Sequence, residues 1–515
     1  MDELHDSNSL TQLCDPAFAV YRAYRIRWAV VLMLALLNGT NAFLWISFAP
    51  VADHFMAFYS TDETFLNWMQ LIFPLTTVLF GLPACLFVDW FGVRVVLFVS
   101  ATANILCGLL RVITSLGSWW SSSVARLTVV VIGQVIASIA QPLCMFTPTK
   151  LALDWFPDGQ RTIANTIGSL GNSMGVLLGS ALVPVFVLQP ADIPTLNYIS
   201  MGLVILGLIL TAVIVRHDKP KSPPSTAAAV LNQIHSKETR LLGARMLLFL
   251  HNVRQPLACF GFWLLMCSFG CGLAYFTALS TLFEQILCTK GYSNQYAGLC
   301  GALLICAGMV ASGFSAWFAD RTGLLIEAVK VCYVLSALGT VGFSVALYFP
   351  HQSVSILLFV SLLGAFGFAQ YSLALELAAE ATFPVPESIT TGLLIIFSQI
   401  LSIVFVQWMQ ATATDARPNV DFQPVCGPAA TPKDYAMSNL TVCALLVLIG
   451  LIQLFALQVP YKRRAASVTL STQVNDRPIV PESDVSELPD PSMPQATETN
   501  SSVSLHYPKV DKPVF

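Results

Sequence analysis

The sequence predicts an all-α membrane protein whose twelve transmembrane helices form two pseudo-symmetric bundles of six. Three observations carry this prediction. Hydrophobic residues make up 55% of the 515-residue chain, whereas charged residues make up only 11%. Twelve apolar runs are long enough to cross the roughly 30 Å hydrocarbon core of a bilayer. A polar stretch separates these runs into two sets of six, and a short loop motif recurs at the same place in both sets.

The composition also limits the partners of the chain. A mean hydropathy of +0.69 reflects more apolar surface than one water-soluble core could bury, so we expect lipid to be the solvent. The formal net charge of -3 provides no basic field that would collect nucleic acid. We therefore expect the partners to be the lipid bilayer and a small-molecule solute, with no nucleic acid and no cofactor, and we expect a monomer.

The apolar runs place the predicted spans. The first six are expected at 28–52, 67–88, 93–114, 124–148, 162–187 and 196–215. The second six are expected at 256–282, 295–319, 328–349, 353–377, 388–411 and 436–459. The predicted domains are an N-terminal tail (1–27), a first bundle (28–215), a linker (216–255), a second bundle (256–459) and a disordered tail (460–515).

Positively charged residues lie mainly on one side of these spans. They include Arg22, Arg25, Arg27, Lys150, Arg161, Arg216, Lys219, Arg321, Lys330 and Lys462. Because cytoplasmic loops carry the excess of Lys and Arg, both termini are predicted to be cytoplasmic. Span lengths do not separate the plasma membrane from an endolysosomal membrane, so both locations stay open. Cys288 and Cys426 fall on the opposite side, where oxidation is permitted, and whether they pair also stays open.

The repeated motif lies in the short loops on the cytoplasmic side. The chain reads Asp89-Trp-Phe-Gly92-Val-Arg94 after the second span and Asp320-Arg321-Thr-Gly323 after the eighth. The glycines permit a tight reversal, each Asp can face the positive N-terminus of a neighbouring helix, and an Arg can pair with it across the bundle interface. We interpret these residues as a latch that holds the cytoplasmic side shut in one conformational state. An ordinary Asp-x-x-Gly turn is the alternative for either copy alone.

This motif resembles the loop signature of the major facilitator superfamily, with Trp90 where that signature has Arg. Longer strings resemble solute carrier family 49, the feline leukaemia virus subgroup C receptor-related transporters, and the first string is most similar to an orphan member of that family. These strings include NAFLWISFAPVAD at 41–53, LNW at 66–68, STLFEQ at 280–285 and GLL at 392–394. The resemblance covers about 28–460 and implies the major facilitator fold, in which two halves alternately open a central site.

The resemblance also implies a central pocket in which aromatic side chains of the first and seventh helices enclose a choline-like cation near glutamines. Trp45, Gln141 and Gln399 fall at matching positions. Thr277 takes the place of the aromatic residue on the seventh helix, with Tyr275 close by. Each of these residues could instead have a structural role. Trp45 could be a packing aromatic, and the two glutamines could form hydrogen bonds between helices.

The residue types inside the spans point to an uncharged pocket. The carboxylates Asp53, Glu284 and Glu380 lie toward helix ends, and a charge at the bilayer centre is usually kept for ion or proton relays. The deep polar residues, such as Asn41 and Gln134, are neutral. We therefore expect facilitated diffusion of a neutral or quaternary-ammonium solute. A receptor or scaffold that has lost transport, and a transporter of haem or another metabolite, are the alternatives. An enzyme is not expected, because the sequence lacks metal-ligand spacing and an acid pair within a span.

Overall fold

The computed structural model describes residues 24–116, 123–157, 160–220, 222, 224, 242–382, 385, 387–415, 425–426 and 433–462. Most of the predicted N-terminal tail, the middle of the predicted linker and the predicted C-terminal tail beyond residue 462 lie outside this part of the chain. The boundaries of the predicted domains accordingly remain predictions.

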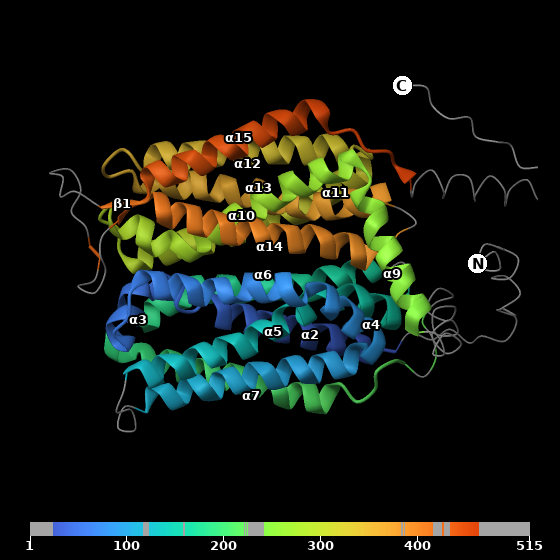
Figure 1. Ribbon diagram of the computed structural model, residues 1–515, viewed down its shortest axis with the longest axis horizontal. Coiled ribbons are helices and arrows are strands. Elements are labelled where there is room, and N and C mark those ends of the chain that lie inside the picture. Colours follow the sequence, from blue (N-terminus) through green and yellow to red (C-terminus); the bar gives the residue numbers. More distant parts are fainter. Residues whose placement is uncertain are drawn as a thin grey trace, which may run out of the picture. The chain divides into compact units, whose positions relative to one another are not determined.

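The described chain is almost entirely helical. The first half contains α2 (Ile26–Ile46), η3 (Ala49–Val51), α3 (Ala52–Tyr59), α4 (Glu63–Ser115), α5 (Ser123–Trp155), α6 (Arg161–Phe186), η6 (Pro190–Asp192) and α7 (Ile193–Ile214). The second half contains α10 (Phe260–Cys288), α11 (Asn294–Thr322), α12 (Leu325–Ala346), α13 (Ser353–Thr382), α14 (Glu387–Thr412) and α15 (Ala436–Ala456). Figure 1 shows α10 to α15 grouped on one side and α2 to α7 on the other.

The helices account for the twelve predicted crossings. Among the described residues, 11 helical segments are long and apolar enough to span a membrane. One of them, α4, is 53 residues long, and its backbone leaves the helical region at Gly92 (φ +77°, ψ 172°), so it makes two crossings. Only glycine adopts this conformation readily. The predicted turn between the second and third spans therefore lies where the sequence places it.

Two helix boundaries differ from the predictions. The first span was expected to reach residue 52, but α2 ends at Ile46 and the chain continues as η3, with Pro50 in its first turn, and then α3. Proline supplies no backbone N–H and clashes with the preceding helical turn, which favours a break here, whereas α4, α5 and α6 continue through internal prolines. The seventh span was expected from residue 256, but a separate helix, α9 (Leu242–Leu257), occupies the end of the predicted linker, and α10 begins at Phe260.

A stripe of glycines on α6 packs against α2. A Cβ built on Gly175 would overlap the carbonyl oxygen of Gly39, and one built on Gly171 would overlap that of Ala35. Only glycine fits at this backbone distance, as is usual where membrane helices cross closely. This crossing fixes α2, and hence Trp45, against the rest of the first half.

We name the two ends of the membrane-spanning helices after structural features found there. The disulfide end contains α3, the start of α4, the end of α10 and the two short strands β1 (Thr414–Asp415) and β2 (Lys433–Asp434), which pair antiparallel. The linker end contains Gly92 and Gly323 and faces α9. In Figure 1, α3 and β1 lie on the left and α9 on the right.

Candidate functional site

Trp45 lies near the end of α2 and is only 6% exposed. Its indole Nε1–H donates to the backbone carbonyl of Gln70 on α4 at 3.1 Å. Trp45 belongs to a continuous apolar cluster that also contains Tyr275 and Phe283 of α10. The indole is thus fixed at a place where the apolar cores of the two halves are continuous.

Gln141 of α5 and Gln399 of α14 belong to opposite halves. Both are nearly buried, at 7% and 6% exposure, and Oε1 of Gln141 has no hydrogen-bond partner. The two helices touch at Phe146 and Gly392, because a Cβ on Gly392 would lie 3.8 Å from the Phe146 ring. At a rise of about 1.5 Å per residue, Gln141 and Gln399 lie roughly 7.5 Å and 10.5 Å along their helices from that contact, toward the disulfide end. The two amides therefore sit at similar depth.

The other predicted pocket residues have partners within one half. The Tyr275 hydroxyl donates to Oδ1 of Asn439 at 2.9 Å, which ties α10 to α15. The Thr277 hydroxyl donates to the carbonyl of Leu273 on its own helix at 3.0 Å. Nδ2 of Asn41 donates to Oδ1 of Asn104 and to the Ala137 carbonyl, both at 2.8 Å. These bonds hold helices together, so Trp45, Gln141 and Gln399 remain the stronger candidates for contact with a solute.

Two buried polar residues were missed by the sequence analysis. Gln70 is 1% exposed and neither atom of its amide has a hydrogen-bond partner. Arg111 is fully buried, and its guanidinium donates to Ser47 and Gln134 and lies 4.2 Å from the Phe48 ring. The position of Arg111 inside an apolar run could have revealed its burial, because an arginine in a spanning helix normally faces partners in the bundle interior.

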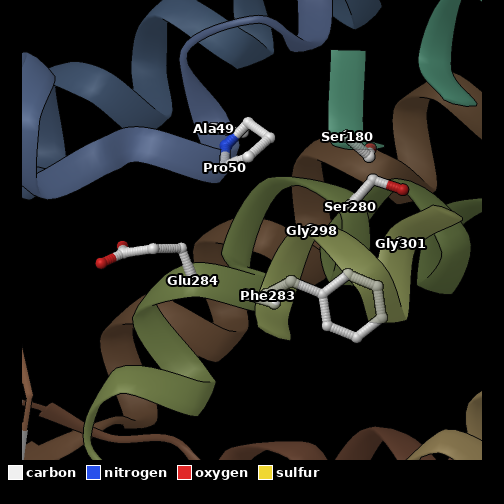
Figure 2. Close-up of a pocket in the computed structure, with 9 residues that line it drawn as sticks. Ala49, Pro50, Ser180, Ser280, Phe283, Glu284, Gly298 and Gly301 are labelled. Atoms are coloured by element: carbon white, nitrogen blue, oxygen red, sulfur yellow. The ribbon is translucent and has the colours of Figure 1, made fainter. Parts of the chain in front are cut away.

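A small cavity lies between the halves near the disulfide end, with room for about one water molecule. Figure 2 shows it between the η3 turn, with Pro50, and α10, with Ser280, Phe283 and Glu284. Ser180 of α6 and the glycines of α11 complete the lining. The predicted pocket residues do not line this cavity.

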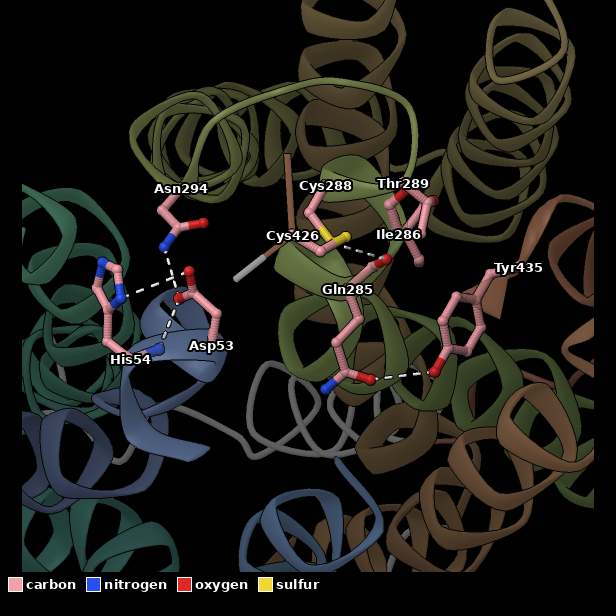
Figure 3. Close-up of a disulfide and its surroundings, with 9 residues drawn as sticks. All are labelled: Asp53, His54, Gln285, Ile286, Cys288, Thr289, Asn294, Cys426 and Tyr435. Atoms are coloured by element: carbon pink, nitrogen blue, oxygen red, sulfur yellow. Dashed lines mark hydrogen bonds and ion pairs between the residues drawn. A yellow bond between two sulfur atoms is a disulfide. The ribbon is translucent and has the colours of Figure 1, made fainter. Parts of the chain in front are cut away.

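Polar side chains join the halves at the disulfide end. Nδ2 of Asn67 donates to Oε1 of Gln285 at 3.1 Å, and Nε2 of Gln285 donates back to Oδ1 of Asn67 at 2.9 Å. Nδ2 of Asn294 donates to Oδ1 of Asp53 at 2.7 Å. Figure 3 shows the Asp53–Asn294 contact beside Gln285. We call these four residues the polar seal.

The cysteines left open by the sequence form a disulfide. Cys288, the last residue of α10, is bonded to Cys426, which precedes β2 (Figure 3). Lys290 and Asp434 form an ion pair at 3.2 Å in the same region. The segment between α14 and α15 is thus tied to the end of α10, close to the polar seal.

At the linker end, the predicted latch residues make different contacts. Asp89 pairs with Lys150 of α5 at 3.7 Å, and the backbone N–H of Arg94 donates to the Asp218 carboxylate at 3.0 Å. The first contact stays within the first half, and the second joins this half to the start of the predicted linker, so neither reaches the second half. The Arg94 guanidinium lies 5.9 Å from the Phe98 ring.

The second copy of the motif closes α11. Gly323 ends the helix in the left-handed region (φ +71°), and its N–H donates to the Ala319 carbonyl. The Arg321 guanidinium lies 5.9 Å from the Trp317 ring, and the side chain of Asp320 lies outside the described part of the chain. The two glycines make the predicted turns, whereas the latch across the halves remains a prediction.

Across the linker half of the spans, the two halves touch through apolar side chains. A Cβ built on Gly81 of α4 would lie 2.8 Å from the Ile396 side chain of α14, and one on Gly392 would lie 3.4 Å from Sγ of Cys85. Phe146 of α5 lies against Gly392 as well. We call these five residues the apolar seal.

This arrangement of two helical halves can be compared with known proteins. Residues 31–406 match the profile of the Major Facilitator Superfamily. The chain belongs to this superfamily. It is also 34% identical over 456 residues to Solute carrier family 49 member A3 of Xenopus tropicalis, a match that covers 88% of this chain and 91% of that protein. The chain is thus a member of solute carrier family 49, and the resemblance found in its sequence is confirmed.

Two further comparisons describe more distant relatives. The human Choline/ethanolamine transporter FLVCR2 is 29% identical over 397 residues, covering 75% of this chain and 72% of that one. The crystal structure of a D-xylose-proton symporter superposes with a TM-score of 0.59 at 15% identity, covering 86% of this chain and 99% of the other. The latter likeness supports the fold alone. Together these findings identify an integral multi-pass membrane protein of a transporter family.

Proposed function

We propose that this protein carries a small neutral or quaternary-ammonium solute, choline-like in chemistry, across a membrane by alternating access and without ion coupling. Its membership of a family of transporters supports transport in general. The name of the FLVCR2 relative, a choline/ethanolamine transporter, supports a quaternary or primary amine as the solute class.

The proposal is supported by three buried side chains from helices of both halves, Trp45, Gln141 and Gln399. The indole presents an aromatic face to the core shared by the halves, and such a face attracts a cation by about 0.5–2 kcal/mol. Oε1 of Gln141 lacks a donor in this structure and would accept a hydrogen bond from a hydroxyl or ammonium group of the solute. Gln399 lies at similar depth on the facing half, so closure of the halves would bring both amides onto one solute.

Several finer features belong to this proposal. Both termini face the cytoplasm, which places the linker end on the cytoplasmic side and the disulfide end outside the cytoplasm. The latch residues act at the linker end, the working unit is a monomer, and the membrane is the plasma membrane or an endolysosomal one.

A tracer panel tests the proposed transport. Cells that express the protein and control cells are compared for uptake of choline, ethanolamine, haem, vitamins and amines. We expect raised, saturable uptake of choline or ethanolamine. Uptake of haem alone would contradict the solute class, and no difference for any tracer would favour the receptor or scaffold alternative.

The first mutational prediction concerns Trp45. Trp45→Ala should reduce choline uptake by about 10-fold or more at unchanged surface expression, because it removes the aromatic face and the contact that orders it. Trp68→Ala is the matched control, since Trp68 is 46% exposed on α4. Equal uptake by wild type and Trp45→Ala would reject this site.

A further inference from the structure

Glu284 is a buried acid that the proposed solute site does not use. It lies on α10 directly before Gln285, whose amide belongs to the polar seal, and it is 3% exposed. Its Oε1 has no hydrogen-bond partner. Figure 2 shows its side chain beneath the η3 turn of the first half, at the edge of the small cavity. This carboxyl group is thus enclosed between the two halves where they meet.

The groups that act electrostatically on Glu284 are themselves acidic. Asp53 of α3 and Glu63 at the start of α4 both repel its charged form. The Tyr435 hydroxyl ahead of α15 lies within electrostatic range of Glu63 and Glu284 and donates to Gln285. Basic groups nearby have other partners, because His54 lies 3.5 Å from Asp53, Lys433 acts on Glu63, and Lys290 pairs with Asp434.

Burial and repulsion together disfavour a negative charge at this place. An ionised carboxylate without a paired charge or donors costs several kcal/mol when it is enclosed, and a neutral carboxylic acid avoids most of that cost. If the halves separate at the disulfide end, water reaches the carboxyl group and the ionised form is no longer penalised. The protonation of Glu284 and the closure of this end are therefore linked.

We propose that Glu284 is a proton-binding site that makes closure of the disulfide end depend on pH. The proton moves from water at the disulfide end to the Glu284 carboxylate as the seal forms, and it returns to the same water when the seal opens. Because the proton enters and leaves on one side, it drives no uphill transport, so the site is compatible with facilitated diffusion. The inference rests on the alternating access in the proposed function and adds its regulation.

The direction of the effect follows from this linkage. Low pH at the disulfide end stabilises the closed state, and high pH favours its opening. For one linked proton, the ratio of open to closed molecules changes by up to about tenfold per pH unit. If the disulfide end faces the exterior or an organelle lumen, a low pH there holds the protein in the state whose solute site is open to the cytoplasm.

A distance measurement on the full chain tests the proposal without any solute. Spin labels are placed on Thr64→Cys and Val354→Cys, exposed positions on the first and second halves, in a background where Cys14 and Cys306 are Ser. Pulsed electron spin resonance then gives the distance between the labels in nanodiscs at pH 5.5 and pH 8.5. We expect one short distance at pH 5.5 and an added longer population at pH 8.5.

Two variants decide whether Glu284 is responsible. Glu284→Gln imitates the protonated acid and should keep the short distance at both pH values, whereas Glu63→Gln, which removes one of the two repelling carboxylates, should keep a pH response but a weaker one. Identical wild-type distances at both pH values, or an unchanged response in Glu284→Gln, would overturn the proposal.

Tracer uptake separates the two proposals. Uptake that occurs without any dependence on pH or on Glu284 refutes the proton site and leaves the transport function standing. A pH-dependent distance in a protein that transports none of the tracers supports the proton site and refutes the proposed function.

Discussion

The two ends of the protein are closed by different chemistry. At the disulfide end, the halves are joined by neutral amides and one carboxylate, in the pairs Asn67–Gln285 and Asp53–Asn294. Toward the linker end, the halves meet through apolar side chains and close glycine contacts, such as Gly81 with Ile396. The ion pair of that end, Asp89 with Lys150, lies within the first half, and the backbone N–H of Arg94 bonds to Asp218 just after α7.

This difference indicates how each end would open. Hydrogen bonds are directional and are lost over small displacements, so a polar seal opens by breaking a few identifiable bonds that water can replace. Apolar contacts are spread over many atoms and have little directional preference, so the apolar seal can slide or loosen gradually. We infer that the polar seal determines how the two halves align when the disulfide end closes. Packing at Gly81 and Gly392 determines how tightly the other end closes.

The largest expected effect comes from locking the polar seal. Asn67→Cys combined with Gln285→Cys, joined by a short bis-thiosulfonate linker, should reduce choline uptake to background because the halves can no longer separate there. Reduction of the linker should restore uptake, and either single variant treated in the same way is the control. Wild-type uptake by the linked protein would show that this end does not open during transport.

A smaller effect is expected from crowding the apolar seal. Gly81→Leu forces a side chain against Ile396, and overpacking of this kind costs about 1–3 kcal/mol, which corresponds to roughly 5–150-fold in the balance between two states. The buried thiol of Cys85 reports the change, because it should react faster with a maleimide once this end loosens. Gly202→Leu is the matched control, since nothing lies within 4 Å of that position. Equal labelling of Cys85 in Gly81→Leu and wild type would mean that this contact does not close the end.

The smallest expected effect comes from trimming a support of the polar seal. Tyr435→Phe removes the hydroxyl that donates to Oε1 of Gln285 at 3.1 Å, a loss of about 0.5–1.5 kcal/mol, while the bond from Asn67 remains. The spin-label distance at the disulfide end should show a modest longer population. Tyr461→Phe, which loses a contact with the Ile326 N–H in the second half, is the control and should leave that distance unchanged. The same response from both variants would refute a local role for Tyr435.

The spans and turns were the most predictable part of the structure. A bilayer demands about twenty apolar residues per crossing, so hydropathy alone located every helix that crosses. Gly92 and Gly323 marked turns because their positive φ values suit glycine. The break at Pro50 and the separate helix α9 were missed because an apolar run does not reveal where its axis changes direction.

The contacts between halves were much less predictable. Asn67 and Gln285 are 218 residues apart, and nothing in either local sequence tells which face of its helix meets the other half. The sequence placed Glu284 toward a helix end, yet the closed halves bury it. The family resemblance located Trp45, Gln141 and Gln399, but it did not show that Tyr275 bonds to Asn439 within the second half.

Tracer counterflow tests the central claim most directly, since only a carrier that exposes one site to each side in turn exchanges solute in this way. Purified protein is placed in liposomes loaded with unlabelled choline, and labelled choline is added outside. We predict a transient accumulation of label above its equilibrium level, which Trp45→Ala abolishes and Trp68→Ala retains. Entry of label at the rate of empty liposomes, whatever the internal choline concentration, would contradict the account.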